Sequence, residues 1–149
     1  MKPFLLILLT VGLIWLRSSL GKLSGGTFVQ DLGETLTKVT PKNPHPWFRD
    51  FLTSTVIPNS QVFATLVLTG EFLSAVLITT GALGLLLNPR PHKLMSKALI
   101  AGLVIGAFLN ITFWLGFGYT SASTDSLNLL MAVIQIIGAF YVLKGLKKA

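Results

Sequence analysis

Apolar and polar positions follow one another along this chain in long blocks rather than residue by residue. Each apolar block is close to the roughly 20 residues that a helix needs to cross the hydrocarbon core of a bilayer. The pattern therefore predicts an all-α, polytopic membrane protein, with one membrane domain over residues 1–149 folded as a four-transmembrane-helix bundle. The predicted spans run over about 3–23, 61–87, 98–117 and 126–143.

The first apolar block resembles the core of a signal peptide, because it follows Met1-Lys2 and carries no charge over residues 3–16. Arg17 interrupts the region where cleavage would occur, and Ser19-Leu20-Gly21 is a weak small-x-small site. These features favour a retained first span, with cleavage as the alternative.

The longest polar break, residues 24–60, predicts an outer loop. Gly25 and Gly26 open it, and a proline-rich stretch over 40–46 interrupts it again. Within the loop, residues 31–39 predict one short helix. Residues 47–57 predict an amphipathic helix that lies on the membrane surface or over the mouth of the bundle, with a plain connector as the alternative. Its expected apolar side consists of Trp47, Phe48, Phe51, Leu52 and Ile57.

Composition agrees with this pattern. Hydrophobic residues make up 52% of the chain and charged residues 11%, and the mean hydropathy is +0.73. Soluble domains are about 25% charged, so lipid is favoured as the main solvent. The formal net charge of +7 lies mostly at the ends of the apolar blocks, whereas a nucleic-acid-binding protein carries a basic stripe on a polar surface. We therefore expect membrane lipid as a partner and no nucleic acid.

Basic residues mark one side of the predicted domain. Arg90, Lys93 and Lys97 occupy the turn between the second and third spans, whereas the turn between the third and fourth carries only Asp125. By the positive-inside rule the basic turn is cytoplasmic, together with both termini, which add Lys2 and three C-terminal lysines. The chain is then integral to the cytoplasmic (inner) membrane, with its longest polar break outside.

Several chemistries are excluded by residues that the chain lacks. It has no cysteine, which excludes disulfides, thiolate redox chemistry, iron–sulfur clusters and zinc sites built on sulfur. Its two histidines, His45 and His92, stand beside prolines between spans, and His45 is expected to be a solvated loop residue. We expect no metal site. No nucleophile–base pair or phosphate loop can be assembled either, so an enzyme acting alone is the least favoured interpretation.

One strongly polar residue interrupts each predicted span. Counted at 1.5 Å per residue from the outer edge, Glu71 lies about 14 Å deep in the second span and Gln135 about 12 Å deep in the fourth. Asn110 lies about 8–11 Å deep in the third span, and Arg17 about 9 Å deep in the first. These side chains therefore share one layer in the outer half of the predicted bundle.

Helical spacing places most of these residues on faces made largely of short side chains. In the third span such a face lets helices approach closely. It consists of Ala98, Gly102, Gly106 and Asn110. The corresponding face of the second span consists of Ala64, Val67, Glu71, Ser74 and Ala75. That of the fourth span consists of Asn128, Ala132, Gln135 and Ala139, and that of the first span of Gly12, Trp15, Ser19 and Lys22. Arg17 lies off the last face, so Lys22 would have to reach down to Glu71 in its place.

Glu71 is the candidate catalytic residue, because a carboxylate at membrane depth needs a cation, a proton or water. The candidate ligand-binding residues are Arg17, Lys22, Asn110, Trp114 and Gln135. Asn110 and Gln135 have a structural alternative, hydrogen bonds between helices that are worth about 0.6 kcal/mol each. Trp114, like Tyr119, is favoured as an anchor at the membrane interface over a stacking partner for a ligand.

Four short features occur together along the chain. The first span ends in Gly21-Lys22-Leu23, a proline-punctuated outer break follows, Gly70-Glu71 stands midway along the second span, and residues 89–91 form a basic Pro-Arg-Pro turn. In these features, which extend over most of its length, the chain resembles the DoxX/DoxD-like membrane proteins. It has Leu8 where an arginine is common early in the first span, and Ser19 where a glycine commonly precedes the lysine by three residues.

The resemblance implies a four-helix bundle and association with membrane-linked oxidoreductases, the namesake being a small subunit of a thiosulfate:quinone oxidoreductase. In a first hypothesis the chain is such a subunit of a quinone-linked complex, Glu71 exchanges the proton that quinone reduction requires, and a partner subunit supplies the electrons. The quinone head group would then occupy a pocket lined by Glu71, Asn110, Trp114 and Gln135.

In a second hypothesis the chain is a non-catalytic accessory or assembly subunit packed against a larger membrane protein complex. Glu71 would then be neutralised by Lys22, Arg17 or a residue of the partner, and the small-residue stripe and outer loop would be interfaces. A small transporter or channel is less favoured, because no inverted repeat or pair of broken helices is visible in the sequence.

Overall fold

A computed structural model describes residues 2–88 and 93–146, and every regular element in these ranges is helical. The main helices are α1 (Lys2–Gly25), α4 (Ser60–Leu87), α5 (Lys93–Phe117) and α6 (Ala122–Leu146). The described part of the chain contains four helical stretches long and apolar enough to cross a membrane, one in each predicted position. α5 begins five residues earlier than the expected 98, because Lys93 to Lys97 continue the helix.

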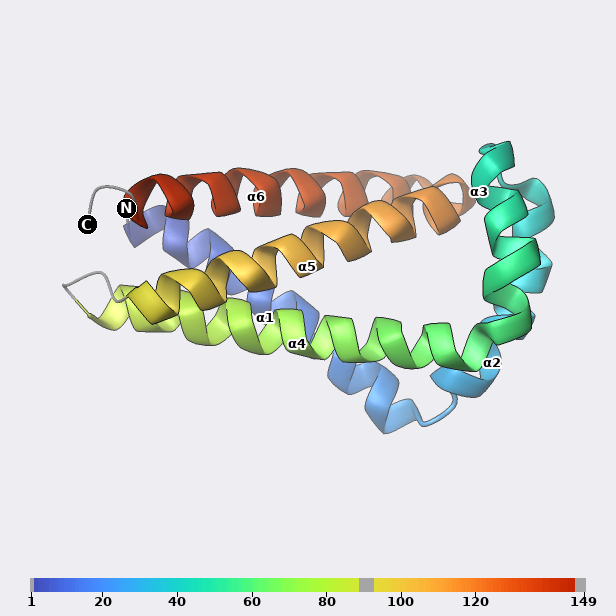
Figure 1. Ribbon diagram of the computed structural model, residues 1–149, viewed down its shortest axis with the longest axis horizontal. Helices are drawn as coiled ribbons and strands as arrows, with labels where there is room; N and C mark the ends of the chain where they lie inside the picture. The colour runs from blue at the N-terminus through green and yellow to red at the C-terminus, as the bar shows by residue number, and fades with distance from the viewer. Residues whose placement is uncertain (1, 89–92, 147–149) are drawn as a thin grey trace.

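The long helices pack in chain order, α1 on α4, α4 on α5 and α5 on α6. Both ends of the described chain lie at one end of the bundle, and α2 (Phe28–Val39) and α3 (Pro46–Phe51) lie across the other end (Figure 1). We call residues 28–59 the cap. Besides α2 and α3 it contains three short segments, η1 (Thr40–Lys42), the π-helix η2 (Leu52–Val56) and η3 (Ile57–Asn59). A fourth short segment, η4 (Gly118–Thr120), joins α5 to α6.

Small residues on α4 and α5 decide how closely these two helices approach. A Cβ on Gly102 would lie 2.9 Å from the backbone nitrogen of Ile78, and one on Gly81 would lie 2.8 Å from that of Leu99. Gly102, Gly106 and Asn110 are all buried. The small-residue face predicted for the third span is therefore confirmed as a contact surface.

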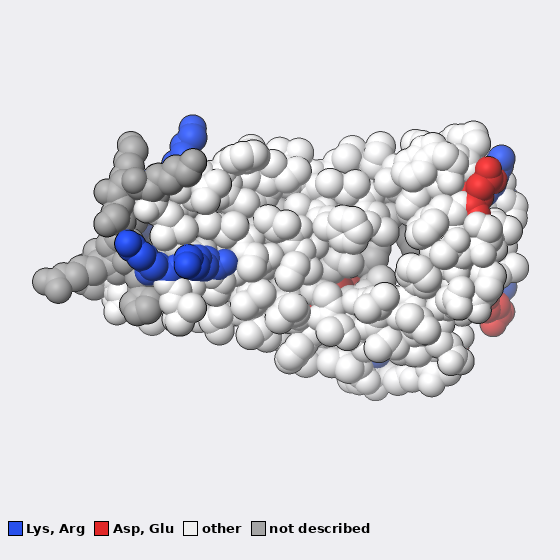
Figure 2. All heavy atoms as spheres, in the orientation of Figure 1, with Lys and Arg blue, Asp and Glu red and all other residues white. Residues whose placement is uncertain are grey.

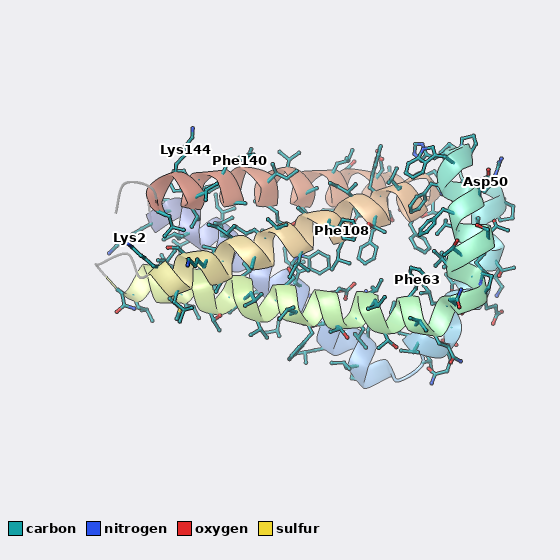
Figure 3. The ribbon with its side chains drawn as sticks, viewed as in Figure 1. Lys2, Asp50, Phe63, Phe108, Phe140 and Lys144 are labelled. Carbon is teal, nitrogen blue, oxygen red and sulfur yellow. The ribbon has the colours of Figure 1, made fainter. Side chains whose placement is uncertain are left out.

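The opposite helix faces are apolar and exposed. Phe108 on α5 and Phe140 on α6 are 69% and 61% exposed (Figure 3). Large exposed apolar surfaces of this extent do not occur on ordinary soluble monomers. The long helices therefore bury polar residues such as Glu71, Asn110 and Gln135 inside the bundle and expose apolar side chains on its outside.

Both helices predicted within the outer loop are present, and the segment is more helical than expected: α2 begins at Phe28, and α3, η2 and η3 cover residues 46–59. The chain turns at Gly26, whose φ of 71° is the left-handed conformation that favours glycine, and then forms α2. From Pro46 onward α3, η2 and η3 run directly into α4. Pro46 opens α3 after the extended residue His45, where its missing N–H costs no helical hydrogen bond, and the other two prolines stand in the first turns of η1 and η3.

The cap has its own small apolar core, and only part of the predicted apolar side contributes to it. Phe48, Leu52 and Val56 are buried against Leu36 of α2. These three residues are spaced by four and therefore share one stripe of the helix. Trp47 lies about 100° away from Phe48 around the helix axis, and it is 63% exposed. Phe51 and Ile57 are also only partly covered. The cap does lie over the bundle end, since Phe48 faces Gly116 of α5.

Asn43 fastens the cap to the bundle. Its side-chain amide donates to the carbonyl of Leu115 at 2.8 Å, and its side-chain oxygen accepts from the backbone N–H of His45 at 2.9 Å. The residue is 3% exposed. Because a buried polar group costs free energy once its partner is lost, this bridge holds the cap in one position.

Asn43→Ala is expected to loosen the cap by about 1–3 kcal/mol, since the Leu115 carbonyl and the His45 N–H both lose a partner. Hydrogen–deuterium exchange should then speed up over residues 28–59 and stay unchanged in the middle of α5. Asn59→Ala is the matched control, because Asn59 is exposed and bonds only to Thr55 within its own segment. Equal exchange in the two variants would contradict the role given to Asn43.

Apart from Arg17, Lys22 and Glu71 of the long helices, the charged residues gather towards the two ends of the bundle (Figure 2). Lys2, Lys144 and the lysines that open α5 lie at the end where the termini meet, and Asp50 lies in the cap (Figure 3). The basic turn residue Arg90 and the last two lysines, Lys147 and Lys148, lie outside the described residues. The apolar middle of the bundle thus separates a basic end from an end of mixed charge.

Candidate functional site

Glu71 of α4 is fully buried and forms an ion pair with Lys22 of α1. One carboxylate oxygen contacts the Lys22 ammonium, and the other accepts from the Ser18 hydroxyl at 3.1 Å. Both oxygens of the carboxylate are therefore engaged by α1. The pair links α1 to α4 inside the bundle.

Aromatic rings enclose the cation of this pair. The Lys22 nitrogen lies 4.8 Å from the ring centroid of Phe28 and 5.4 Å from that of Phe113. Cation–π attraction at such distances is worth about 0.5–2 kcal/mol. Lys22 keeps 26% of its side chain exposed, so its ammonium stands between the buried carboxylate and the surface.

Asn110 and Gln135 form a second polar pair in the bundle, between α5 and α6. The Asn110 amide donates to the side-chain oxygen of Gln135 at 2.8 Å, and both residues are buried. This bond is the structural role that the sequence left open for them. It joins two neighbouring helices without involving Glu71.

Two buried donors meet beside Gly106 without a partner of their own in the described part of the chain. They are the indole nitrogen of Trp15 and the amide nitrogen of Gln135. A Cβ on Gly106 would lie 2.9 Å from the Trp15 nitrogen and would clash with the Gln135 nitrogen. The Ser74 hydroxyl borders the same point but already donates to the carbonyl of Gly102 at 2.9 Å. Glycine at 106 thus leaves room for two converging donors.

A pocket of about 460 Å³ lies at the capped end, where α5 passes through η4 into α6. Its lining residues are Pro44, His45, Trp114, Gly118, Tyr119, Ser121, Ala122 and Asp125. The Trp114 indole donates to Asp125 at 2.6 Å, and its ring lies 5.6 Å from that of His45. His45 lies between η1 and α3, as the sequence predicted for a loop residue, but it is half-buried because Asn43 draws its backbone onto the bundle.

The structure divides the predicted site residues among three places. It brings Lys22 to Glu71, as the helical phase of α1 suggested. It pairs Asn110 with Gln135. Trp114 instead lines the pocket at the capped end, which none of the other candidates line. Arg17 is exposed on α1, away from the face that carries Lys22.

Three residues of these clusters were missed by sequence reasoning. Ser18 stands one turn before Lys22, and this spacing of four is the signal that could have joined it to the ion pair. Trp15 was identified only as a member of a helix face. Asp125 was noted in the sequence only as the charged residue of the turn between the third and fourth spans. Its hydrogen bond from Trp114 depends on the path that η4 takes from α5 to α6.

Comparisons of the chain with protein-family models, curated proteins and solved structures gave no match.

Proposed function

We propose that this chain is a DoxX/DoxD-like integral protein of the cytoplasmic membrane, with both termini in the cytoplasm. The apolar outer faces of the long helices support the membrane location. The basic end of the bundle, where the termini lie, supports the orientation. The resemblance is supported by one contact in particular. Lys22 belongs to the motif that ends the first span and Glu71 to the motif midway along the second, and the two side chains meet.

Within the membrane the chain acts as a non-catalytic accessory subunit of a larger complex. The observation that carries this role is the full engagement of Glu71, whose two oxygens contact Lys22 and Ser18. A carboxylate held in this way ties α1 to α4, which is a structural role for this residue. The exposed apolar faces then contact lipid and partner subunits.

The topology can be tested directly because the chain has no cysteine of its own. Ser54 in the cap and Lys144 near the C-terminus are both exposed, so a single cysteine can be placed at either position. In intact cells a membrane-impermeant maleimide is expected to label Ser54→Cys and to label Lys144→Cys only after the cells are opened. The reverse pattern would contradict the orientation.

The accessory role is tested by extracting the chain from its native membrane in mild detergent and identifying what co-purifies by mass spectrometry. A stoichiometric larger membrane complex is expected, and its activity should survive deletion of this chain with reduced assembly or abundance. Recovery of the chain alone, with no partner at any detergent strength tested, would contradict the role.

A quinone-linked function is the second candidate, and the converging donors of Trp15 and Gln135 favour it. A quinone carbonyl accepts hydrogen bonds, so two unpartnered N–H groups at one point match its chemistry. In this case Gln135→Leu and Glu71→Gln would slow quinone-linked turnover of the purified complex while the complex still assembled. Full turnover in both variants at saturating quinone would leave only the accessory role.

A further inference from the structure

The pocket at the capped end has a chemical character that differs from the rest of the bundle. It combines three aromatic or heteroaromatic rings, those of His45, Trp114 and Tyr119, with one carboxylate, Asp125. Its volume of about 460 Å³ is within the range of small-molecule sites, which is about 300–1,000 Å³. The exposed residues Pro44, Ser121 and Ala122 at its edge open it to the surface.

Two donors of this pocket are already used inside the protein. The Trp114 indole N–H donates to Asp125, and the Tyr119 hydroxyl donates to the carbonyl of Val39, both at 2.6 Å. The His45 imidazole and the Ser121 hydroxyl also line the pocket, and each can donate as well as accept a hydrogen bond. The feature that selects among ligands is therefore the Asp125 carboxylate beside the ring faces, which suits a ligand that carries positive charge.

Asp125 adds a negative charge that forms no ion pair with a basic side chain of the described residues. The ion pairs described over residues 2–88 and 93–146 join Lys22 to Glu71 and Lys38 to Glu34, and neither includes Asp125. Its one described side-chain partner is the neutral indole of Trp114. A carboxylate beside aromatic faces attracts a cation both by charge and through the ring quadrupoles.

The ring geometry fits the same ligand class. The rings of His45 and Trp114 pack against each other in a tilted contact, with centroids 5.6 Å apart and an angle of 48° between the planes, so together they form one aromatic wall of the pocket. Asp125 stands against Trp114 on the side of α6. Aromatic walls with an acidic residue beside them are the arrangement that recognises alkylated ammonium groups.

We propose that this pocket binds an organic ammonium cation, held against the aromatic wall of His45 and Trp114 with its charge beside Asp125. The ammonium belongs either to the head group of a membrane lipid or to a free amine. Its position at the junction of α5 and α6, at one end of the apolar part of the bundle, is open to both sources.

Tetramethylammonium chloride is the first probe, titrated into the full-length protein in an uncharged maltoside detergent and followed by isothermal calorimetry. We expect saturable binding, and no binding of 3,3-dimethylbutanol, a neutral compound of similar shape. Asp125→Asn keeps an oxygen for the Trp114 indole but removes the charge, and it should weaken binding by about tenfold or more. Asp50→Asn, an exposed acid elsewhere in the cap, is the matched control and should bind normally.

Native mass spectrometry of the protein extracted from its membrane distinguishes the two sources. Retention of ethanolamine or choline lipids by the wild type and their loss in Asp125→Asn would assign the site to a lipid head group. Asp125-dependent binding of tetramethylammonium with no such lipid retained would assign it to a free amine. Equal affinity for the cation and its neutral counterpart, or unchanged binding in Asp125→Asn, would overturn the proposal.

Discussion

Lys22→Met is expected to destabilise the fold by about 3–5 kcal/mol, because it leaves the fully buried carboxylate of Glu71 without its cation. Ser18 alone would remain to hydrogen-bond that carboxylate. The cost can be measured as the shift in the unfolding curve when the protein in mixed micelles is titrated with a denaturing detergent. A thermal unfolding series followed by far-ultraviolet circular dichroism would give an independent value.

The two partners of the ion pair are not equivalent, which sharpens this prediction. In Glu71→Gln the ammonium of Lys22, whose side chain is 26% exposed, can turn toward water, so the loss should be only about 1–2 kcal/mol. The double variant Lys22→Met/Glu71→Gln should recover much of the loss caused by Lys22→Met alone, since no buried charge remains.

Lys38→Met is the matched control. Lys38 pairs with Glu34 within α2 at 2.5 Å, but both side chains are about 70% exposed. Exposed pairs of this kind contribute about 0.3–0.5 kcal/mol. A cost for Lys22→Met no greater than that for Lys38→Met would mean that Glu71 is neutralised in another way, and the accessory role would lose its main support.

The long helices and their buried faces were predictable from local pattern. Apolar blocks of about 20 residues set the helix lengths, and spacing by three and four identified Glu71, Ser74, Gly102 and Gln135 as inward-facing. All four are buried. These features depend on residues within a few turns of one another, and the sequence contains that information.

The cap and the pocket depend on contacts between distant parts of the chain. Prolines that suggested a broken loop turned out to open helical segments, since the neighbouring apolar residues could be buried only against the bundle end. His45 reaches Trp114 because Asn43 bonds to the carbonyl of Leu115, 72 residues away. No local pattern specifies such a bond, so the pocket could not be predicted from the sequence.

Gly102→Ala is expected to separate α4 from α5 and to destabilise the bundle by about 1–3 kcal/mol. Its Cβ would lie 2.9 Å from the backbone nitrogen of Ile78 and 2.9 Å from the Cβ of Leu77. A backbone atom cannot move aside as a side chain can, so the helices must part. The hydrogen bond from Ser74 to the Gly102 carbonyl, 2.9 Å long, would lengthen with them.

Gly21→Ala provides the contrast that makes this result interpretable. Gly21 is also within a long helix, but a Cβ there would meet nothing within 4 Å. Alanine is favoured over glycine inside a helix by about 0.5–1 kcal/mol, so this variant should be slightly more stable than the wild type. Opposite shifts of the two unfolding curves would show that helix approach, rather than helix propensity, is what glycine at 102 provides. Equal shifts would mean that α4 and α5 have room to spare, and the close contact between them would not be a source of stability.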